Sequence, residues 1–303
     1  MLETRRTHRS HLAAAFQRRL RAIKRELDGA LGGDVDAVHQ MRVASRRLRE
    51  ALPVLTLAGE DREDMLGGRK LRRQARRVTT ALGGVREMDV ALATLEEFGG
   101  RSSSVTAATE AIRAALEQER SARRAEMLRR LESLDLKALG RKITTLVVAF
   151  DLVADEDHRY LLLGDRIRRR IDGLEAAVDS AGTMYAADRL HAVRIAAKKL
   201  RYALELAREL AHVPTLALTR RLKEIQDLLG RLHDLEVLAG HARGIEAAAD
   251  SSEELRASAA ALVAAIEGEI IRLHADYVGQ RETLNMVINR CRGKVCPRMT
   301  AAA

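Results

Sequence analysis

Two stretches of the chain place histidine and basic residues at the same helical spacing. The first basic motif, residues 36–52, reads DAVHQMRVASRRLREAL, and the second, residues 188–204, reads DRLHAVRIAAKKLRYAL. The matched positions are His39, Arg42, Arg46, Arg47 and Arg49, then His191, Arg194, Lys198, Lys199 and Arg201. Arginine suits phosphoryl oxygens because its planar fork can donate two parallel hydrogen bonds. The duplication predicts a two-sided clamp for a long, repetitive anion.

Helical geometry gathers the cations of each motif into a stripe. At about 100° per residue, one arc of roughly 80° contains His39, Arg42, Arg46 and Arg49. A separate arc, about 130° away, carries the apolar side chains expected to pack into a core, namely Met41, Leu48, Leu52 and Leu55. The second motif repeats this pattern with Val193, Leu200 and Leu204. The basic stripe spans about 15 Å, which fits several consecutive phosphates better than one small metabolite.

A third basic stretch follows the first motif. Residues 69–77 hold Arg or Lys at six of nine positions without one acid, and one helix face carries Arg69, Arg73 and Arg76. Because like charges at these spacings destabilise a helix, an acid-free stripe favours ligand binding over mere solubility. The counterpart in the second half is thinner, since acids follow its basic residues Arg220, Arg221 and Lys223.

The apolar periodicity and the glycine positions predict an all-α protein. We expect helical segments at about 6–28, 35–58, 62–83, 86–98 and 104–134, then 157–181, 184–211, 214–230, 232–249 and 251–279. Short connections imply antiparallel neighbours, hence two pseudo-symmetric helical bundles with internal repeats over about 5–150 and 155–280. We expect one domain over 1–303, with a joint at the acidic stretch 151–157 and a basic tail over 281–303.

The charge and the aromatic content narrow the choice of partner. The net charge of +10 favours polyphosphate, nucleic acid or an acidic membrane face. Proteins that bind single-stranded nucleic acid usually stack bases on aromatic rings, and this chain has three Phe, four Tyr and no Trp. The ligand is therefore expected to resemble phosphate rather than a base.

The cysteines and the apolar stretches of the sequence indicate neither a zinc site nor a membrane span. Cys291 and Cys296 have no further cysteine with which to complete a zinc site, so we expect free thiols in a frayed tail. The apolar stretch 12–16 is too short for a secretory signal, and the longest apolar run, 143–154, contains Asp151 and is too short for a bilayer. These features predict a soluble, cytoplasmic protein without a membrane partner.

The basic motifs resemble those of the CHAD family, the conserved histidine α-helical domain. The pattern H-x-x-R-x-x-x-[RK]-[RK]-L-R at 39–49 and 191–201 is similar to the two signature helices of that family. The pattern L-G-x-x-R-E-x-D-V at 82–90 resembles its third element, with Glu87 where Asp is commoner. The resemblance covers about 5–280 and implies two pseudo-symmetric helical bundles with a basic channel or cleft between them. It also implies binding of inorganic polyphosphate, often on polyphosphate granules.

The resemblance also implies a set of ligand contacts. These are His39, Arg42, Arg46, Arg47, Arg49, Arg69, Arg73, Arg76, Arg86, His191, Arg194, Lys198, Lys199, Arg201, Arg220, Lys223 and His233.

Many relatives carry a fused triphosphate-tunnel domain with an E-x-E-x-K strand, and the sequence contains no such motif. A hydrolase would need carboxylates to hold magnesium beside the phosphates, and none interleaves with the stripes. We therefore expect binding without catalysis, cofactor or metal.

Two other functions compete with this one. A helical nucleic-acid-binding protein would have the same positive charge, and an enzyme acting on polyphosphate would share the ligand. A granule scaffold that recruits other granule proteins is compatible with the leading hypothesis.

Overall fold

The computed structural model describes residues 2–55, 68–99, 103–153, 156–249 and 251–297, and every regular element in these ranges is helical. The first half contains α1 (Leu2–Gly32), α2 (Val35–Ala51), η1 (Leu52–Leu55), α4 (Gly68–Ala81), α5 (Gly83–Gly99), η2 (Ser103–Val105), α6 (Thr106–Glu132) and α7 (Leu136–Val153). The second half contains α8 (Glu156–Ala181), α9 (Ala187–Ala211), α10 (Leu216–Ala247), α11 (Glu253–Arg290) and η3 (Cys291–Val295). The predicted all-α fold class is confirmed.

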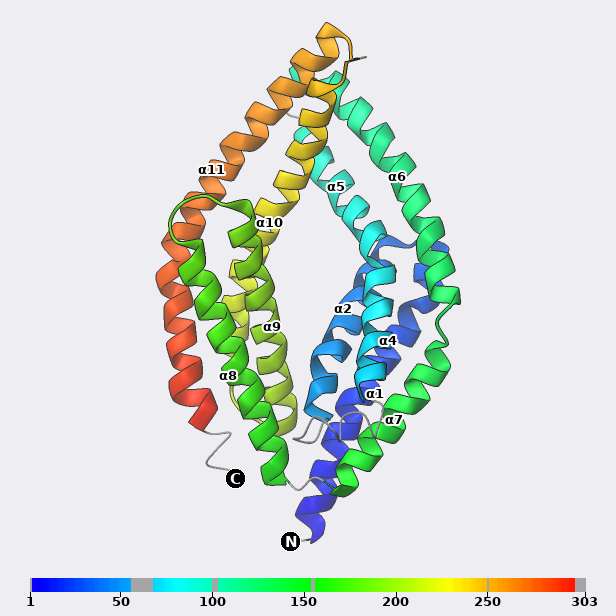
Figure 1. Ribbon diagram of the computed structural model, residues 1–303, viewed down its shortest axis with the longest axis vertical. Helices are drawn as coiled ribbons and strands as arrows, with labels where there is room; N and C mark the ends of the chain where they lie inside the picture. Colours follow the sequence, from blue (N-terminus) through cyan, green and yellow to red (C-terminus); the bar gives the residue numbers. More distant parts are fainter. Residues whose placement is uncertain (1, 56–67, 100–102, 154–155, 250, 298–303) are drawn as a thin grey trace.

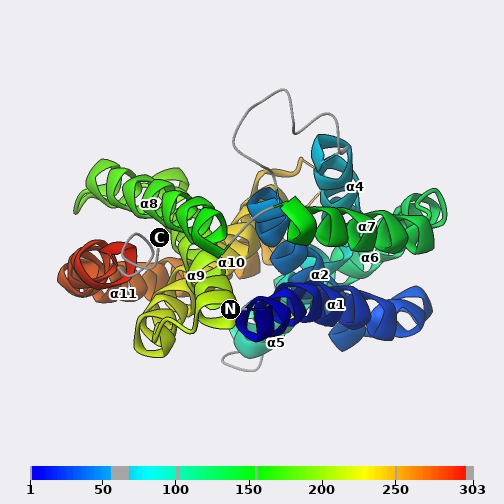
Figure 2. The ribbon, with the colours of Figure 1, turned by 90° about the horizontal axis from the view of Figure 1, so that it is seen from below.

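The two halves stand side by side as two groups of helices (Figures 1 and 2). They contact each other at both ends of the long axis: α1 and α2 meet α9 at one end, and α5 and α6 meet α10 and α11 at the other. The chain passes from α7 to α8 within the acidic stretch expected to be the joint. Between these two contact zones, α2 and α5 face α9 and α10.

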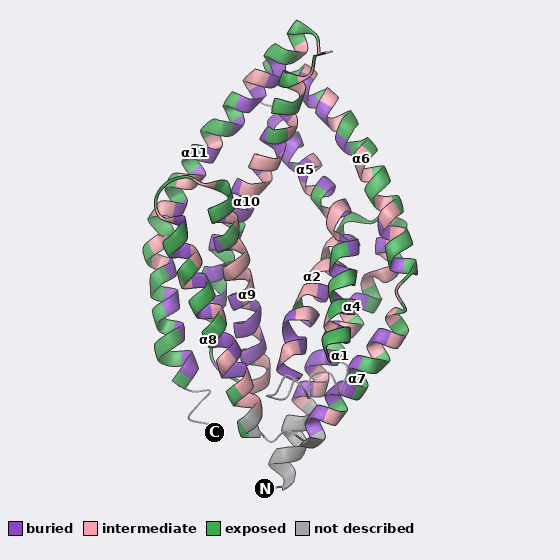
Figure 3. Cartoon of the chain, viewed as in Figure 1, coloured by how far each residue is buried: buried purple, intermediate pink, exposed green. Residues whose placement is uncertain are grey.

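Apolar seams hold each group together. Met41 and Leu48 of the first motif and Val193 and Leu200 of the second are all fully buried, as their helical spacing predicts. Buried positions lie where helices face one another, whereas the outer faces are exposed (Figure 3). Asp34 starts α2 as its N-cap, because its Oδ1 accepts a hydrogen bond from the Ala37 backbone N–H at 2.6 Å. The cap thus fixes where α2 begins, and the buried apolar side chains fix which face of α2 points away from the core.

The predicted set of helices differs from the structure in several places. The predicted break after residue 230 does not occur: α10 runs through Gly230, which is buried within the helix. The predicted set omits α7, although its buried Leu139, Ile143, Leu146 and Phe150 repeat at three- and four-residue steps. The predicted helix 251–279 extends to Arg290, because Leu284, Val287 and Ile288 continue its buried face.

The two cysteines do not lie in a frayed segment. Cys291 begins the short π-helix η3, and both Cys291 and Cys296 are buried. Burial raises the pKa of both thiols. Arg292, between them, pairs with Asp172 and Glu175 of α8 at 2.8 and 2.7 Å, so this end of the described chain is docked on the second half. Among the described helices, none has the length and apolar character required to cross a bilayer.

Candidate functional site

A cavity of about 620 Å³ lies between the two halves, with α2 and α5 on one side and α9 and α10 on the other. We call it the central cavity. It gathers the following predicted ligand residues: His39, Arg42, Arg46, Arg86, His191, Arg194, Lys198, Arg201, Lys223 and His233. Both basic motifs therefore present their stripes to one shared space, where side chains far apart in the sequence can contact one ligand.

The second cation of each motif lies over a glycine of the neighbouring helix. The guanidinium of Arg42 lies against Gly83, where an added Cβ would come within 3.0 Å of Nη1. Arg194 takes the equivalent place over Gly230, with Nε and Nη2 3.5 Å from such a Cβ. Arg42 Nη1 also donates to the Thr79 carbonyl oxygen at 2.9 Å, which fixes its side chain. Gly83 therefore leaves space that Arg42 uses, whereas a Cβ at Gly230 would make only ordinary van der Waals contact with Arg194.

Arg201 is held at the cavity wall by three neighbours. Its Nε donates to Gln226 Oε1 at 3.0 Å, and its Nη1 donates to Glu205 Oε1 at 2.5 Å. Its guanidinium lies 4.7 Å from the centroid of the Tyr202 ring. These contacts pre-organise the fork before any ligand arrives.

Two of the cavity histidines form a pair. The rings of His191 and His233 lie with centroids 4.5 Å apart and an interplanar angle of 51°. His191 Nδ1 is buried without a hydrogen-bond partner among the described residues. The sequence showed no second histidine at a ligand-like spacing from His191, because this partner comes from another helix. In the described parts of the chain, no group of three His, Cys, Asp or Glu side chains is placed to hold a metal ion.

Burial, followed by the charge of neighbouring cations, lowers the pKa values of several basic groups in the cavity. Burial and then Arg194 lower the pKa of Lys198 to about 7, and the same two causes lower that of His233 to about 4. Burial and Arg86 lower the pKa of His39, whereas burial and Arg46 lower that of Arg42 to about 10. Burial and the repulsion between neighbouring cations thus disfavour the charged forms of these side chains. A bound anion would reduce this repulsion and stabilise the charged forms.

The central cavity also contains three carboxylates, which corrects the expectation that no acid interleaves with the stripes. Glu87, Asp227 and Asp234 line it. Asp227 Oδ2 pairs with Lys223 Nζ at 2.5 Å. Burial raises the pKa of Asp234 despite the opposing charge of Arg194. These acids lie on α5 and α10, outside the helices of the two motifs, so helical periodicity within each motif could not place them.

A second cavity, of about 460 Å³, adjoins the first, and we call it the vestibule. It shares Arg42, Arg46 and Lys198 with the central cavity and adds three predicted residues, Arg49, Arg76 and Lys199. Arg123 and Arg130 of α6 also line the vestibule. Sequence reasoning missed these two arginines, because acids are interspersed through their helix and only the packing of α6 brings them to this wall.

Four predicted ligand residues lie elsewhere. Arg47 faces a separate groove of about 340 Å³, and its Nε pairs with Glu205 Oε2 at 3.2 Å. The other three are Arg69, Arg73 and Arg220. They occupy exposed positions on α4 and α10, outside this groove and outside the two cavities. Arg47 thus joins the halves of the molecule instead of lining the shared space.

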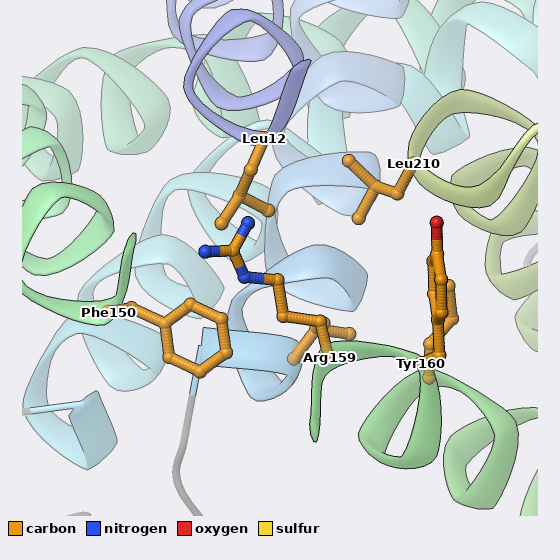
Figure 4. A pocket seen from close by; sticks show the side chains of 7 residues that line it. Leu12, Phe150, Arg159, Tyr160 and Leu210 are labelled. Atoms are coloured by element: carbon orange, nitrogen blue, oxygen red, sulfur yellow. The ribbon is translucent and has the colours of Figure 1, made fainter. Parts of the chain in front are cut away.

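A small pocket near the α7–α8 joint is a packing feature (Figure 4). It holds about 20 Å³, room for about one water molecule. Leu12, Phe150 and Leu210 line it together with Arg159. Arg159 pairs with Asp151 at 3.2 Å and lies 5.9 Å from the centroid of Phe150. The small volume of this pocket and its internal ion pair indicate that it belongs to the packing between α7 and α8.

The fold and the site define an all-helical protein with a cationic cavity between two groups of helices. The chain belongs to the CHAD domain family, whose match covers residues 14–243. It is similar to the crystal structure of the CHAD domain from the plant Ricinus communis, at 23% identity over 93% of this chain and 91% of that one, with a TM-score of 0.62. It is also similar to PptA from Streptomyces chartreusis, at 18% identity over 91% and 99% of the two chains, with a TM-score of 0.63. The comparison with curated proteins finds no match.

Proposed function

We propose that the protein binds inorganic polyphosphate in the central cavity and does not cleave it. One observation carries the proposal: basic side chains from both motifs, among them Arg46 and Lys198, line a single space between the two halves. A polyanion in this space would contact α2 and α5 on one side and α9 and α10 on the other. Membership of the CHAD family supports the same ligand class.

Charge favours a repetitive phosphate ligand over a base-containing one. The pKa values of Lys198 and His233 are lowered first by burial and then by nearby cations, and closely spaced phosphates neutralise such an array. Among its described lining residues, the cavity has one Phe, Tyr or Trp ring, that of Tyr202, and Arg201 already lies over it. Base stacking, on which single-stranded nucleic-acid binding relies, has little support here.

The cavity acids give little support for catalysis. Asp227 already pairs with Lys223, and burial raises the pKa of Asp234, which opposes the charged form that a magnesium ligand needs. Incubation with polyphosphate, ATP and magnesium should therefore release no phosphate and leave the chains their original length. Released phosphate or shortened chains would show that the protein is an enzyme.

The binding test is affinity for long-chain polyphosphate at physiological salt, with duplex DNA and RNA as competitors. Charge reversal on both walls, Arg46→Glu with Lys198→Glu, should abolish binding if both halves line one site. The matched control is Arg73→Glu with Arg220→Glu, which changes the net charge equally at exposed positions outside the cavity. Undiminished binding by the Arg46→Glu, Lys198→Glu variant would refute the shared site, and equal affinity for all three polyanions would defeat the claim of selectivity for polyphosphate.

At the cellular scale, we propose a cytoplasmic protein that associates with polyphosphate granules and with other granule proteins. Polyphosphate binding by the central cavity would be sufficient to bring it there. A fluorescent fusion should co-localise with granules, and the Arg46→Glu, Lys198→Glu variant should be diffuse. A granule signal that survives in this variant would mean that another surface directs localisation.

A further inference from the structure

The vestibule is more strongly basic than the central cavity that it adjoins. Beyond the residues shared by the two cavities, its cations are Arg49, Arg76, Arg123, Arg130 and Lys199. Its one unshared acid, Glu50, is buried and already accepts hydrogen bonds from Arg166 and Arg170 at 2.6 and 3.0 Å. Asp227 and Asp234, by contrast, line only the central cavity. A polyanion that leaves the central cavity would therefore meet its greatest excess of positive charge in the vestibule.

The two cavities adjoin each other and share lining residues. Arg42, Arg46 and Lys198 line both of them, so a phosphate held by these residues already borders the vestibule. In the vestibule, Arg49 lies about one helical turn beyond Arg46, and Lys199 directly follows Lys198. Arg76 on α4 and the two arginines of α6 complete the outer wall of the vestibule.

The packing of α5 against α6 holds Arg123 at this wall. An added Cβ at Gly84 would come within 2.9 Å of Arg123 Cδ, so the absence of a side chain at Gly84 lets the arginine stem cross α5. The preceding residue, Gly83, makes the same kind of room for Arg42. Two adjacent glycines thus seat one arginine of the central cavity and one of the vestibule on a single turn of helix.

The α6 arginines are paired with acids of their own helix. Arg123 Nη2 lies 2.9 Å from Glu119 Oε1, and Arg130 Nε lies 2.5 Å from Glu126 Oε1. Glu126 also pairs with Arg129, which lies outside the vestibule. Exposed ion pairs of this kind contribute little to stability, so the arginines can exchange their carboxylates for phosphate at small cost.

We propose that the vestibule is a second binding segment for the polyphosphate chain, and that it makes the protein favour long chains over short ones. This inference rests on the proposed function. A short chain would occupy the central cavity alone, whereas a long chain would continue past Lys198 to Arg123 and Arg130. Because the second segment binds a chain that is already tethered, its local concentration is high and the gain in affinity is large.

The test compares inorganic tripolyphosphate with long-chain polyphosphate, by calorimetry at fixed salt. The wild type should prefer the long chain. Arg123→Glu with Arg130→Glu should reduce long-chain affinity about tenfold or more, as expected for loss of a tethered contact, while tripolyphosphate affinity stays within about twofold. The matched control is Arg113→Glu with Arg129→Glu, which reverses the same charges on α6 outside the vestibule and should leave long-chain affinity near the wild-type value.

Equal losses in the two pairs of variants would overturn the vestibule, since general charge would then explain the effect. Equal affinity of the wild type for the two ligands would overturn it as well. A wild type that binds neither ligand would instead refute the proposed function. Glu119→Gln should have the opposite effect on affinity. It removes the carboxylate that competes for Arg123 and should strengthen binding of the long chain only.

Discussion

Lys198 illustrates how the site is poised for an anion. Its ammonium group shares the cavity with Arg42, Arg46 and Arg194, and burial with this crowding lowers its pKa to about 7. The unfolded chain would hold the same proton with a pKa near 10.5. Between these two values the unfolded state binds more protons than the folded state, so the stability of the empty protein rises with pH across this window.

Replacing Lys198 with Met should therefore stabilise the empty protein. We expect a gain of about 1–2 kcal/mol in the free energy of unfolding at neutral pH, after allowance for solvent screening. The variant should also lose the rise in stability between about pH 7 and pH 10. Chemical denaturation at several pH values measures both effects, and polyphosphate affinity should fall in the same variant. A less stable variant with an unchanged pH profile would contradict this account of Lys198.

At the scale of elements, buried ion pairs tie helices of the two halves together. Glu50 of α2 accepts hydrogen bonds from Arg166 and Arg170 of α8 and is 8% exposed. On another face of the molecule, Glu205 of α9 binds both Arg47 of α2 and Arg201 of its own helix. These contacts fix α2 relative to the second half, and α2 carries the first basic stripe.

Glu50→Ala should destabilise the fold by about 3–5 kcal/mol, because it leaves Arg166 and Arg170 partly buried without their carboxylate. The measurement is the denaturation midpoint of the empty protein. Glu126→Ala, which removes an exposed carboxylate that also binds two arginines, serves as the control and should leave the midpoint nearly unchanged. Similar midpoints for the two variants would mean that the α2–α8 contact is not a structural brace.

At the scale of the whole molecule, the two halves meet at both ends of the long axis and present like charges to each other between them. At one end, Arg19 pairs with Glu209 at 2.7 Å; at the other, Arg231 pairs with Glu97 at 2.5 Å. A polyanion in the central cavity would replace repulsion across the gap with attraction to both walls.

Polyphosphate should therefore raise the thermal midpoint, by an amount that depends on pH. Saturation to about a hundred times Kd stabilises a folded protein by about 2.7 kcal/mol. Phosphate should raise the lowered pKa values of Lys198, His191 and His233, so binding takes up protons and weakens as pH rises through the pKa of Lys198 near 7. Thermal melts with and without ligand should show a larger shift near pH 6 than near pH 8. A shift independent of pH, or one retained by the Arg46→Glu, Lys198→Glu variant, would argue against binding between the walls.

The helical class and the two stripes could be predicted from sequence because both depend on local periodicity. Met41 and Leu48 are buried while Arg42 and Arg46 line the cavity, and a step of about 100° per residue separates these positions whatever else the chain does. Helix ends were harder to predict. Gly230 reads as a break, yet α10 continues through it, with Leu229 and Leu232 buried on either side.

The membership of the site, in contrast, depends on how helices cross. Arg47 and Arg46 are neighbours in one motif, but rotation about the helix sends Arg47 to Glu205 and leaves Arg46 in the cavity. His191 meets His233, and Arg123 reaches the vestibule, only through contacts between helices that are distant in sequence. Periodicity therefore fixes which face of a helix is basic, whereas long-range packing selects which of those charges share one space.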